Sequence, residues 1–230
     1  VGYDVTPSVN VYAGGQWYDV TGTGYEPTGE FQHGGRTVQV DDLPDLRMLL
    51  TIGVLCNAAE LADDEGRTTV LGDPTEGCLL TAAAKAGLAA AEEHENAPRL
   101  DAVPFESEHQ YMATLHGGPH PVVYVKGSVE ALLHRCGTAL DGAGAKVPLD
   151  AEGVRERVEA LAAQGLRVLA FARLDGHTRE GIDHPDLAVG LTFIGLQGMI
   201  DPPREEAVRA VAACHRAGVS VKMITGDHAL

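Results

Sequence analysis

The feature that most constrains this chain lies between residues 219 and 227, close to its C-terminal end. The apolar run Val219–Ile224 predicts a buried strand, and it leads directly into the small polar turn Thr225–Gly226–Asp227. A buried strand needs neighbouring strands, and an anion-binding turn at the end of a parallel strand needs the helix that follows it. Because only a few residues follow the turn, we expect this sequence to be a piece of a longer protein.

Length and charge limit the classes of protein to be considered. A chain of 230 residues forms one large or two small domains, and a hydrophobic fraction of 44% is enough to build a core. The formal net charge is -16. Such an acidic surface repels phosphate backbones, so we expect no nucleic-acid partner.

Several kinds of segment and site are not expected. No run of about 18 apolar residues suggests a membrane span, and the first residues lack the basic start and apolar run of a signal peptide. The cysteines form no CxxC pair, which favours a reducing compartment over a disulfide framework or zinc site. His116 and His120 flank a turn, but a metal needs three or four ligands, so no metal site is predicted. The cysteines are Cys56, Cys78, Cys136 and Cys214.

Residue patterns up to position 190 predict an α+β domain with a mostly antiparallel sheet flanked by helices. Asp73 and Pro74 mark the start of one helix particularly clearly, because they suit the cap and the first helical position. We expect strands at 9–13, 16–21, 67–71, 101–105, 111–116, 122–126, 166–174 and 187–195, and helices at 44–59, 74–86, 128–136 and 151–164.

The last part of the chain differs in character. A strand over 191–200, a helix over 203–217 and a strand over 219–224 would form one βαβ unit, the building block of a parallel sheet. We therefore predict two domains, residues 1–190 and residues 191–230.

Several short motifs occur in a fixed order, and together they resemble the cytoplasmic part of P-type cation-transporting ATPases, in the calcium/sodium/proton-pump-like branch. The resemblance covers nearly the whole chain, with a nucleotide-binding domain followed by a fragment of the haloacid-dehalogenase-like phosphorylation domain. The motifs are Gly72–Asp73–Pro74–Thr75–Glu76–Gly77, Pro104–Phe105–Glu106–Ser107 with Met112, Lys126–Gly127–Ser128–Val129–Glu130, Gly165–Leu166–Arg167–Val168–Leu169–Ala170, Asp201–Pro202–Pro203–Arg204 and Thr225–Gly226–Asp227.

The resemblance implies an ATP site. Phe105 would stack on adenine, and Lys126 would line the pocket, with Gly127 allowing close backbone approach. Glu76 would accept from the amino group of the base, and Arg167 would reach the phosphates, for which a guanidinium is well suited. Met112 would fill the pocket wall. Each residue also has an alternative interpretation when taken alone. Phe105 could be a core residue, and Glu76 could be only a charge in the first turn of a helix. Lys126 and Arg167 could be surface cations.

One position departs from the family pattern. Many members carry a lysine five residues after the stacking phenylalanine, whereas this chain has Gln110 there, after Glu108 and His109. We therefore expect weaker attraction for ATP, with some pH dependence through His109.

The resemblance also implies what this sequence lacks. Asp201 and Arg204 would lie at the hinge, and Thr225, Gly226 and Asp227 would contact the transferred phosphoryl group. The DKTGT-like phosphorylation loop and the GDGxND-like magnesium segment are absent from the sequence. We expect the chain to bind ATP and to present its γ-phosphate to an aspartate elsewhere in a full-length pump. That pump would use Mg²⁺, hydrolyse ATP and move a cation, while the fragment alone would be inactive.

The expected partners are the remaining phosphorylation, actuator and transmembrane domains, with this segment on the cytoplasmic side of the cell membrane. Two alternatives stay open. One is a non-catalytic interaction module that keeps the fold but not nucleotide binding. The other is a free-standing dehalogenase-like phosphatase, which would need a DxD-type nucleophile loop that this sequence lacks.

Overall fold

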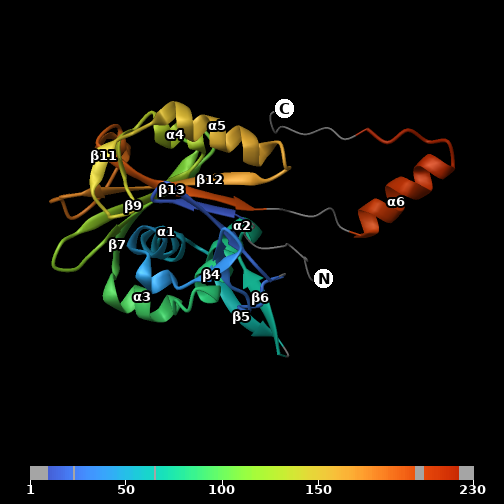
Figure 1. The fold of residues 1–230 in the computed structure, drawn as a ribbon, viewed down its shortest axis with the longest axis horizontal. Helices are drawn as coiled ribbons and strands as arrows, with labels where there is room; N and C mark the ends of the chain where they lie inside the picture. Colours follow the sequence, from blue (N-terminus) through green and yellow to red (C-terminus); the bar gives the residue numbers. More distant parts are fainter. Residues whose placement is uncertain (1–9, 23, 65, 200–204, 223–230) are drawn as a thin grey trace.

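The computed structural model describes residues 10–22, 24–64, 66–199 and 205–222. It is an α+β fold in which helices cover both faces of a large, mostly antiparallel sheet (Figure 1). The predicted fold class is therefore confirmed. No helix in the described ranges is both long enough and apolar enough to cross a bilayer.

The sheet follows the strand order β4-β3-β2-β1-β13-β12-β9-β8-β7, and β10 joins it beside β13. The β10–β13 pair is parallel, whereas the neighbours along that path are antiparallel. The strands are β1 (Asn10–Ala13), β2 (Gln16–Val20), β3 (Phe31–His33), β4 (Arg36–Val38), β7 (Arg99–Glu106), β8 (Tyr111–His116), β9 (Val122–Gly127), β10 (Cys136–Leu140), β11 (Lys146–Pro148), β12 (Arg167–Asp175) and β13 (Leu191–Met199).

Each face of the sheet carries its own apolar core. Helices α1 (Pro44–Leu55), α2 (Pro74–Lys85) and α3 (Ala90–Asn96) lie on one face with the separate hairpin of β5 (Glu60–Asp64) and β6 (Arg67–Leu71). Helices α4 (Val129–Leu133) and α5 (Ala151–Ala162) cover the other face. Two short 3-10 turns complete this part of the chain, η1 (Val40–Asp42) and η2 (His184–Leu187). The alternation of side chains along each strand supplies both cores.

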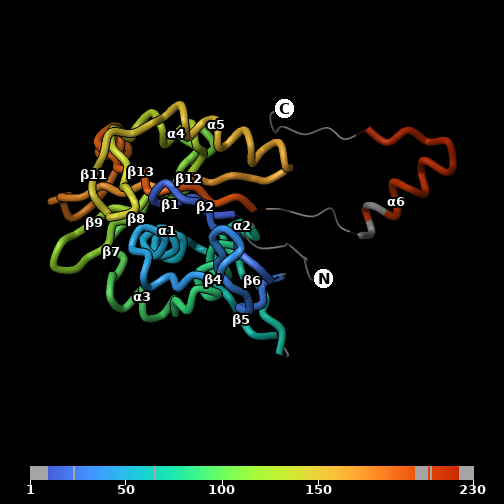
Figure 2. Tube along the Cα trace, in the orientation of Figure 1, coloured from blue at the N-terminus to red at the C-terminus, as the bar shows by residue number. Residues whose placement is uncertain are grey.

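Strand β13 runs through the middle of the sheet and is buried along its whole length. It pairs with β1 on one side and β12 on the other, and Figure 2 shows the N-terminal strands beside it. Residues 191–199 therefore belong to the main sheet, although we expected them to begin a separate βαβ unit. A continuous apolar run is typical of any strand covered on both faces, so the run alone does not identify its sheet.

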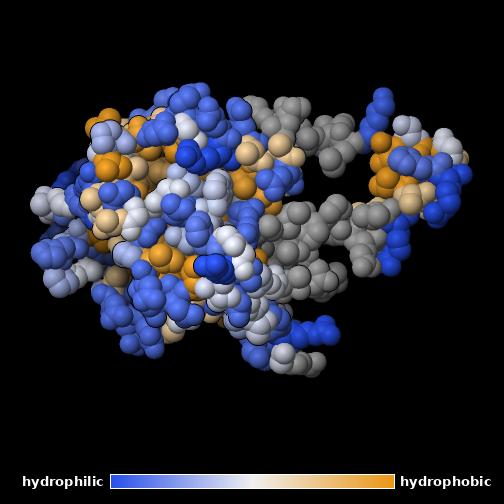
Figure 3. Space-filling model, viewed as in Figure 1, coloured by the Kyte–Doolittle hydropathy of each residue, from blue (hydrophilic) through white to orange (hydrophobic). Residues whose placement is uncertain are grey.

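Other differences from the expected elements are local. The strand expected at 187–195 begins later, because η2 ends at Leu187. The hairpins β3–β4 and β10–β11 and strand β5 were not predicted, since they are short and weakly patterned. The helix expected at 203–217 is confirmed as α6 (Glu205–Arg216), whereas residues 219–222 form no strand. Figure 3 shows apolar side chains exposed on α6, and Val211 is among the exposed residues.

The packing of Gly195 provides a test of this arrangement. A β-carbon there would meet the Tyr12 carbonyl oxygen and lie 2.6 Å from Cδ1 of Leu49. We expect Gly195→Ala to lower the free energy of unfolding by about 1–3 kcal/mol through overpacking. Gly137→Ala in β10 is the matched control, because a β-carbon there meets nothing within 4 Å. Urea unfolding measures the stability of both variants, and equal free energies of unfolding for Gly195→Ala and Gly137→Ala would contradict the described packing.

Candidate functional site

The first turn of α2 holds Glu76 in a defined position. The Asp73 carboxylate caps the helix by accepting from the backbone N–H groups of Thr75 at 2.8 Å and Glu76 at 3.3 Å. Gly77 allows the β5–β6 hairpin to approach, because a β-carbon there would lie 2.6 Å from Cγ1 of Val70. Within this motif, Asp73 therefore caps the helix and Gly77 permits close packing, while Glu76 supplies the acidic side chain of the site.

The Glu76 carboxylate has two partners. Its Oε1 pairs with Nζ of Lys126, and its Oε2 accepts from the backbone N–H of Ala58 at 3.1 Å. The Asn57 side-chain amide donates to the Glu76 carbonyl at 3.0 Å and to the Gly53 carbonyl at 2.8 Å. Asn57, which the motif reasoning missed, thereby links the end of α1 to the start of α2.

Lys126 is a buried cation on β9. It lies opposite Met112 of β8 and Phe171 of β12, and its side chain is only 7% exposed. Burying a charge is costly unless the charge is paired, so the Glu76 carboxylate offsets the cost of burying the Lys126 ammonium group. Burial raises the pKa of the nearby Cys56 thiol, and the Lys126 charge offsets part of that rise. Cys56 is therefore an uncharged core residue at neutral pH.

Phe105 is a large aromatic residue exposed on β7. The pairing between β7 and β8 shifts between Val103, which lies opposite Ala113, and Glu106, which lies opposite Tyr111, so Phe105 sits within this bulge. The residue is 61% exposed. Its ring is therefore accessible to a ligand or a partner, in contrast to the core position that a phenylalanine usually takes.

Gly127 and Gln110 complete the turn region. A β-carbon on Gly127 would lie 2.6 Å from Cβ of Tyr111, so glycine is needed for β8 and β9 to approach. Gln110 adopts a left-handed backbone conformation with φ 58°. Its side-chain oxygen accepts from the Ser128 hydroxyl at 3.2 Å. The structure thus joins Glu76 to Lys126 and sets Lys126 opposite Met112, with Gly127 and Gln110 in the adjoining turn. Phe105 lies on the strand beyond β8.

Arg167 lies apart from this group. It is the first residue of β12, four residues before Phe171, and is exposed. The strand rise puts it about 13 Å along β12 from the level of Lys126. Asp201, Arg204, Thr225, Gly226 and Asp227 lie outside the described residues.

One hollow of the surface lies away from the motif residues. A cavity of about 510 Å³ is lined by the β1–β2 hairpin and α5. Its lining residues are Asn10, Trp17, Asp19, Glu156, Arg157, Ala160, Leu161 and Gln164, and they include no motif residue. Lys126 and Glu76 are not among these lining residues, and their paired side chains are largely buried.

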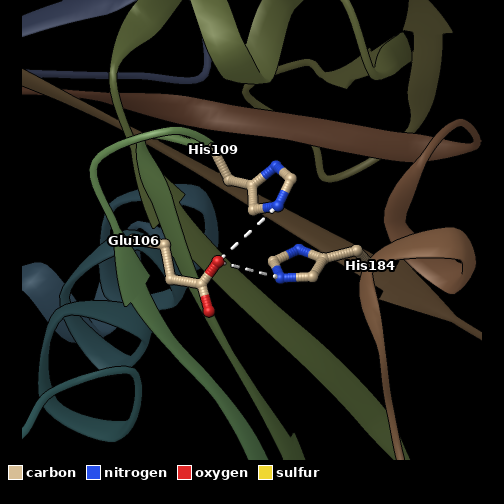
Figure 4. Close-up of side chains that lie close together, drawn as sticks. All are labelled: Glu106, His109 and His184. Atoms are coloured by element: carbon tan, nitrogen blue, oxygen red, sulfur yellow. Dashed lines mark ion pairs between the residues drawn. The ribbon is translucent and has the colours of Figure 1, made fainter.

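The histidines lie differently from the sequence-based expectation. His116 is buried, and its ring nitrogens hydrogen-bond the Ala97 carbonyl at 2.8 Å and the Thr114 hydroxyl at 2.9 Å. His109 does not face Lys126 but stacks on His184, with ring centroids 3.8 Å apart, and both lie near the Glu106 carboxylate (Figure 4). This cluster was not predicted, because nothing in the sequence pattern brings residues 109 and 184 together.

Comparison with known proteins identifies the family. Residues 45–206 match the family described as P-type ATPase, cytoplasmic domain N. The chain belongs to this family. It is 54% identical over 225 residues to cation-transporting ATPase pma1 of Synechocystis sp., covering 95% of this chain and 25% of that protein. The chain thus spans about a quarter of the length of the curated relatives it matches.

Further relatives carry similar names. Probable cation-transporting ATPase F of Mycobacterium bovis is 46% identical over 218 residues, which is 91% of this chain and 23% of that protein. Calcium-transporting ATPase of Bacillus subtilis is 34% identical over 223 residues, which is 95% of this chain and 25% of that protein. The resemblance inferred from the motifs is therefore confirmed.

The Glu76–Lys126 pair leads to a stability prediction. We expect Lys126→Met to cost about 3 kcal/mol, because it leaves a largely buried carboxylate without its cation. The double variant Glu76→Gln with Lys126→Met should lose less than the two single variants together. Arg155→Met is the control, since the Arg155–Glu152 pair is exposed and should contribute under about 1 kcal/mol. Chemical denaturation measures all four variants, and strict additivity at Glu76 and Lys126 would contradict the pairing.

His116 leads to a pH prediction. Burial lowers the pKa of His116 below its ordinary value of 6.5. Between these two pKa values the unfolded chain binds a proton that the folded chain does not, so stability should fall as the pH drops below 6.5. His116→Gln should make this loss smaller, whereas the exposed-site control His120→Gln should leave it unchanged. Urea unfolding across that pH range tests this, and identical profiles for His116→Gln and the parent would refute it.

Proposed function

We propose that this chain is the ATP-binding module of a P-type cation-transporting ATPase. Three of the relatives above are named as cation- or calcium-transporting ATPases, and the matched family is their cytoplasmic domain N. The observation that carries the proposal is the exposed Phe105 ring on β7, two strands from Lys126 of β9 and its partner Glu76. An aromatic face, a cation and a hydrogen-bond acceptor are the groups that an adenine nucleotide needs.

The positions of these groups define a binding mode. The base stacks on Phe105, with Met112 beneath it and the Glu76 carboxylate as acceptor for the amino group. The phosphates extend along the sheet toward Arg167, whose planar guanidinium suits phosphate oxygens. Arg167 is exposed, and no ion pair engages it within the described ranges, which leaves it available for this contact.

The same geometry predicts weak binding to the isolated chain. Lys126 is already neutralised by Glu76, and Gln110 supplies no second cation. The net charge of -16 further opposes an anionic ligand. We expect dissociation constants of roughly 0.1–10 mM for ATP, ADP or AMP.

In the full-length pump, this module would present the γ-phosphate of ATP to an aspartate outside this chain. Catalysis would then depend mainly on positioning and charge neutralisation. That full-length pump would use Mg²⁺ together with ATP. The isolated chain should show no appreciable hydrolysis, and an ATPase rate that copurifies with it would contradict this.

The residues after β13 would start the phosphorylation domain, with Asp201 and Arg204 at the hinge and Thr225, Gly226 and Asp227 at the phosphoryl group. The exposed apolar surface of α6 fits a helix that is covered by the rest of that domain. The partners would be the phosphorylation, actuator and transmembrane domains, and the module would lie on the cytoplasmic side of the membrane.

The second candidate function is a non-catalytic interaction module that keeps the fold without nucleotide binding. Gln110 favours it, because the usual cation at that position is missing. An exposed Phe105 would then serve as a protein contact. Nucleotide binding distinguishes the two functions.

The test is an NMR titration of the chain with ATP and with AMP. We expect chemical-shift changes clustered at Glu76, Phe105 and Lys126, extending to Arg167 for ATP. Phe105→Ala should weaken binding at least tenfold through loss of stacking. Leu100→Ala is the matched control, because Leu100 lies on the same strand and is 56% exposed. No shifts at several millimolar nucleotide would favour the interaction module.

A further inference from the structure

The Glu106–His109–His184 cluster lies on a turn and a loop that the proposed nucleotide contacts do not use. The same Glu106 oxygen, Oε2, lies 3.6 Å from Nε2 of His109 and 3.7 Å from Nε2 of His184 (Figure 4). The candidate ligand atoms all lie within 4.8 Å of one another. Two imidazole nitrogens and a carboxylate oxygen therefore converge on one small volume.

The separations match a tetrahedral metal site. Zinc–ligand bonds of about 2.0–2.1 Å place the ligand atoms of a tetrahedron about 3.3 Å apart. The two carboxylate–imidazole distances exceed this value by only a few tenths of an ångström. Closing the site around an ion requires the two imidazole rings, now packed against each other at 3.8 Å between centroids, to turn their Nε2 atoms toward the ion.

The backbone brings two of the ligands together. The N–H groups of His109 and Gln110 both donate to the Glu106 carbonyl, at 3.1 and 2.8 Å, which makes a single helical turn. Residues three apart on such a turn face the same side. The bulge in β7 precedes this turn and sets where the Glu106 side chain emerges.

The third ligand is held by a separate set of contacts. His184 opens η2, where the side chains and backbones of Asp183 and Asp186 form a capping box. Arg179 pairs with Asp186 at 2.6 Å, and the buried Leu187 anchors the other end of the turn. The loop is also tied to β7, because the Ile182 N–H donates to Asp101 at 2.9 Å.

An outer partner orients the His184 ring. Nδ1 of His184 shares a hydrogen bond of 2.7 Å with the hydroxyl of Tyr111, which is buried and lies under the Arg135 guanidinium. With Nδ1 engaged, Nε2 is the atom directed at Glu106. Ligand histidines in metal sites typically have their second nitrogen held in this way.

We propose that Glu106, His109 and His184 form a binding site for a divalent transition-metal ion of the zinc type. The three side chains supply three ligands, and water completes the tetrahedron. All three are accessible, with side-chain exposures of 50% for Glu106 and 32% for each histidine. Imidazole ligands favour zinc over Ca²⁺ and Mg²⁺, which prefer sites made of oxygen alone. The ion would cross-link the turn next to Phe105 to the loop before β13.

Calorimetric titration of the chain with Zn²⁺ alone, and optical titration with Co²⁺, test the site. We expect one equivalent of Zn²⁺ to bind in the micromolar range and bound Co²⁺ to show the visible absorption of a tetrahedral complex. His109→Ala and His184→Ala should each raise the dissociation constant at least tenfold. Tyr111→Phe should raise it about tenfold through loss of the outer hydrogen bond.

His33→Ala and His120→Ala are the matched controls, because these histidines lie outside the cluster, and they should leave Zn²⁺ affinity unchanged. Thermal unfolding of the metal-free variants establishes that they are folded. In the parent chain, NMR should show Zn²⁺ shifting the ring signals of His109 and His184 selectively, which requires no variant. Equal Zn²⁺ affinity in the parent and both cluster variants would overturn the proposal, as would the absence of those shifts at millimolar Zn²⁺. Neither result depends on whether the chain binds nucleotide.

Discussion

The pairing of β13 with its neighbours is the constraint on which the rest of the structure depends. This nine-residue strand is fully buried, and it joins the N-terminal strand β1 to β12. The register then passes from β12 to β9 and from β9 to β8, which sets Lys126 opposite both Phe171 and Met112. Because a shift of one residue would move every side chain to the other face, the position of Lys126 follows from this chain of pairings.

The chemistry of the site reflects two opposing demands. In the proposed nucleotide site Lys126 would lie near the bound nucleotide, yet its burial requires a carboxylate partner at all times. Glu76 supplies that charge from a capped helix start, and the Ala58 N–H holds its second oxygen. The pair is thus neutral before any ligand arrives, so binding relies on the exposed Phe105 ring more than on long-range attraction. The proposed adenine site is therefore compatible with a strongly acidic chain.

Much of this arrangement could be predicted from the sequence. The Asp73 cap and Pro74 located α2, and short β-rich runs separated by turns located β7, β8 and β9. The family motifs brought Glu76 and Lys126 into one site, and the structure places them in direct contact. Local signals were sufficient here because capping and periodicity act over a few residues.

Long-range features could not be predicted in this way. The membership of β13 in the main sheet depends on partners more than 170 residues away, such as Val11 opposite Gln197. The cluster of His109 and His184 depends on a bulge and on a 3-10 turn, and neither has a strong sequence signature. The hydrogen bond between His116 and the Ala97 carbonyl could not be predicted either, because Ala97 follows the end of α3 and lies 19 residues before His116.

The most direct test of the nucleotide site is to locate bound AMP by intermolecular nuclear Overhauser effects from its adenine protons. Our account predicts contacts to the Phe105 ring and the Met112 methyl group. The competing location is the cavity of about 510 Å³ beside Trp17, which contains no motif residue. Contacts to Trp17 in place of Phe105 would contradict the proposed site.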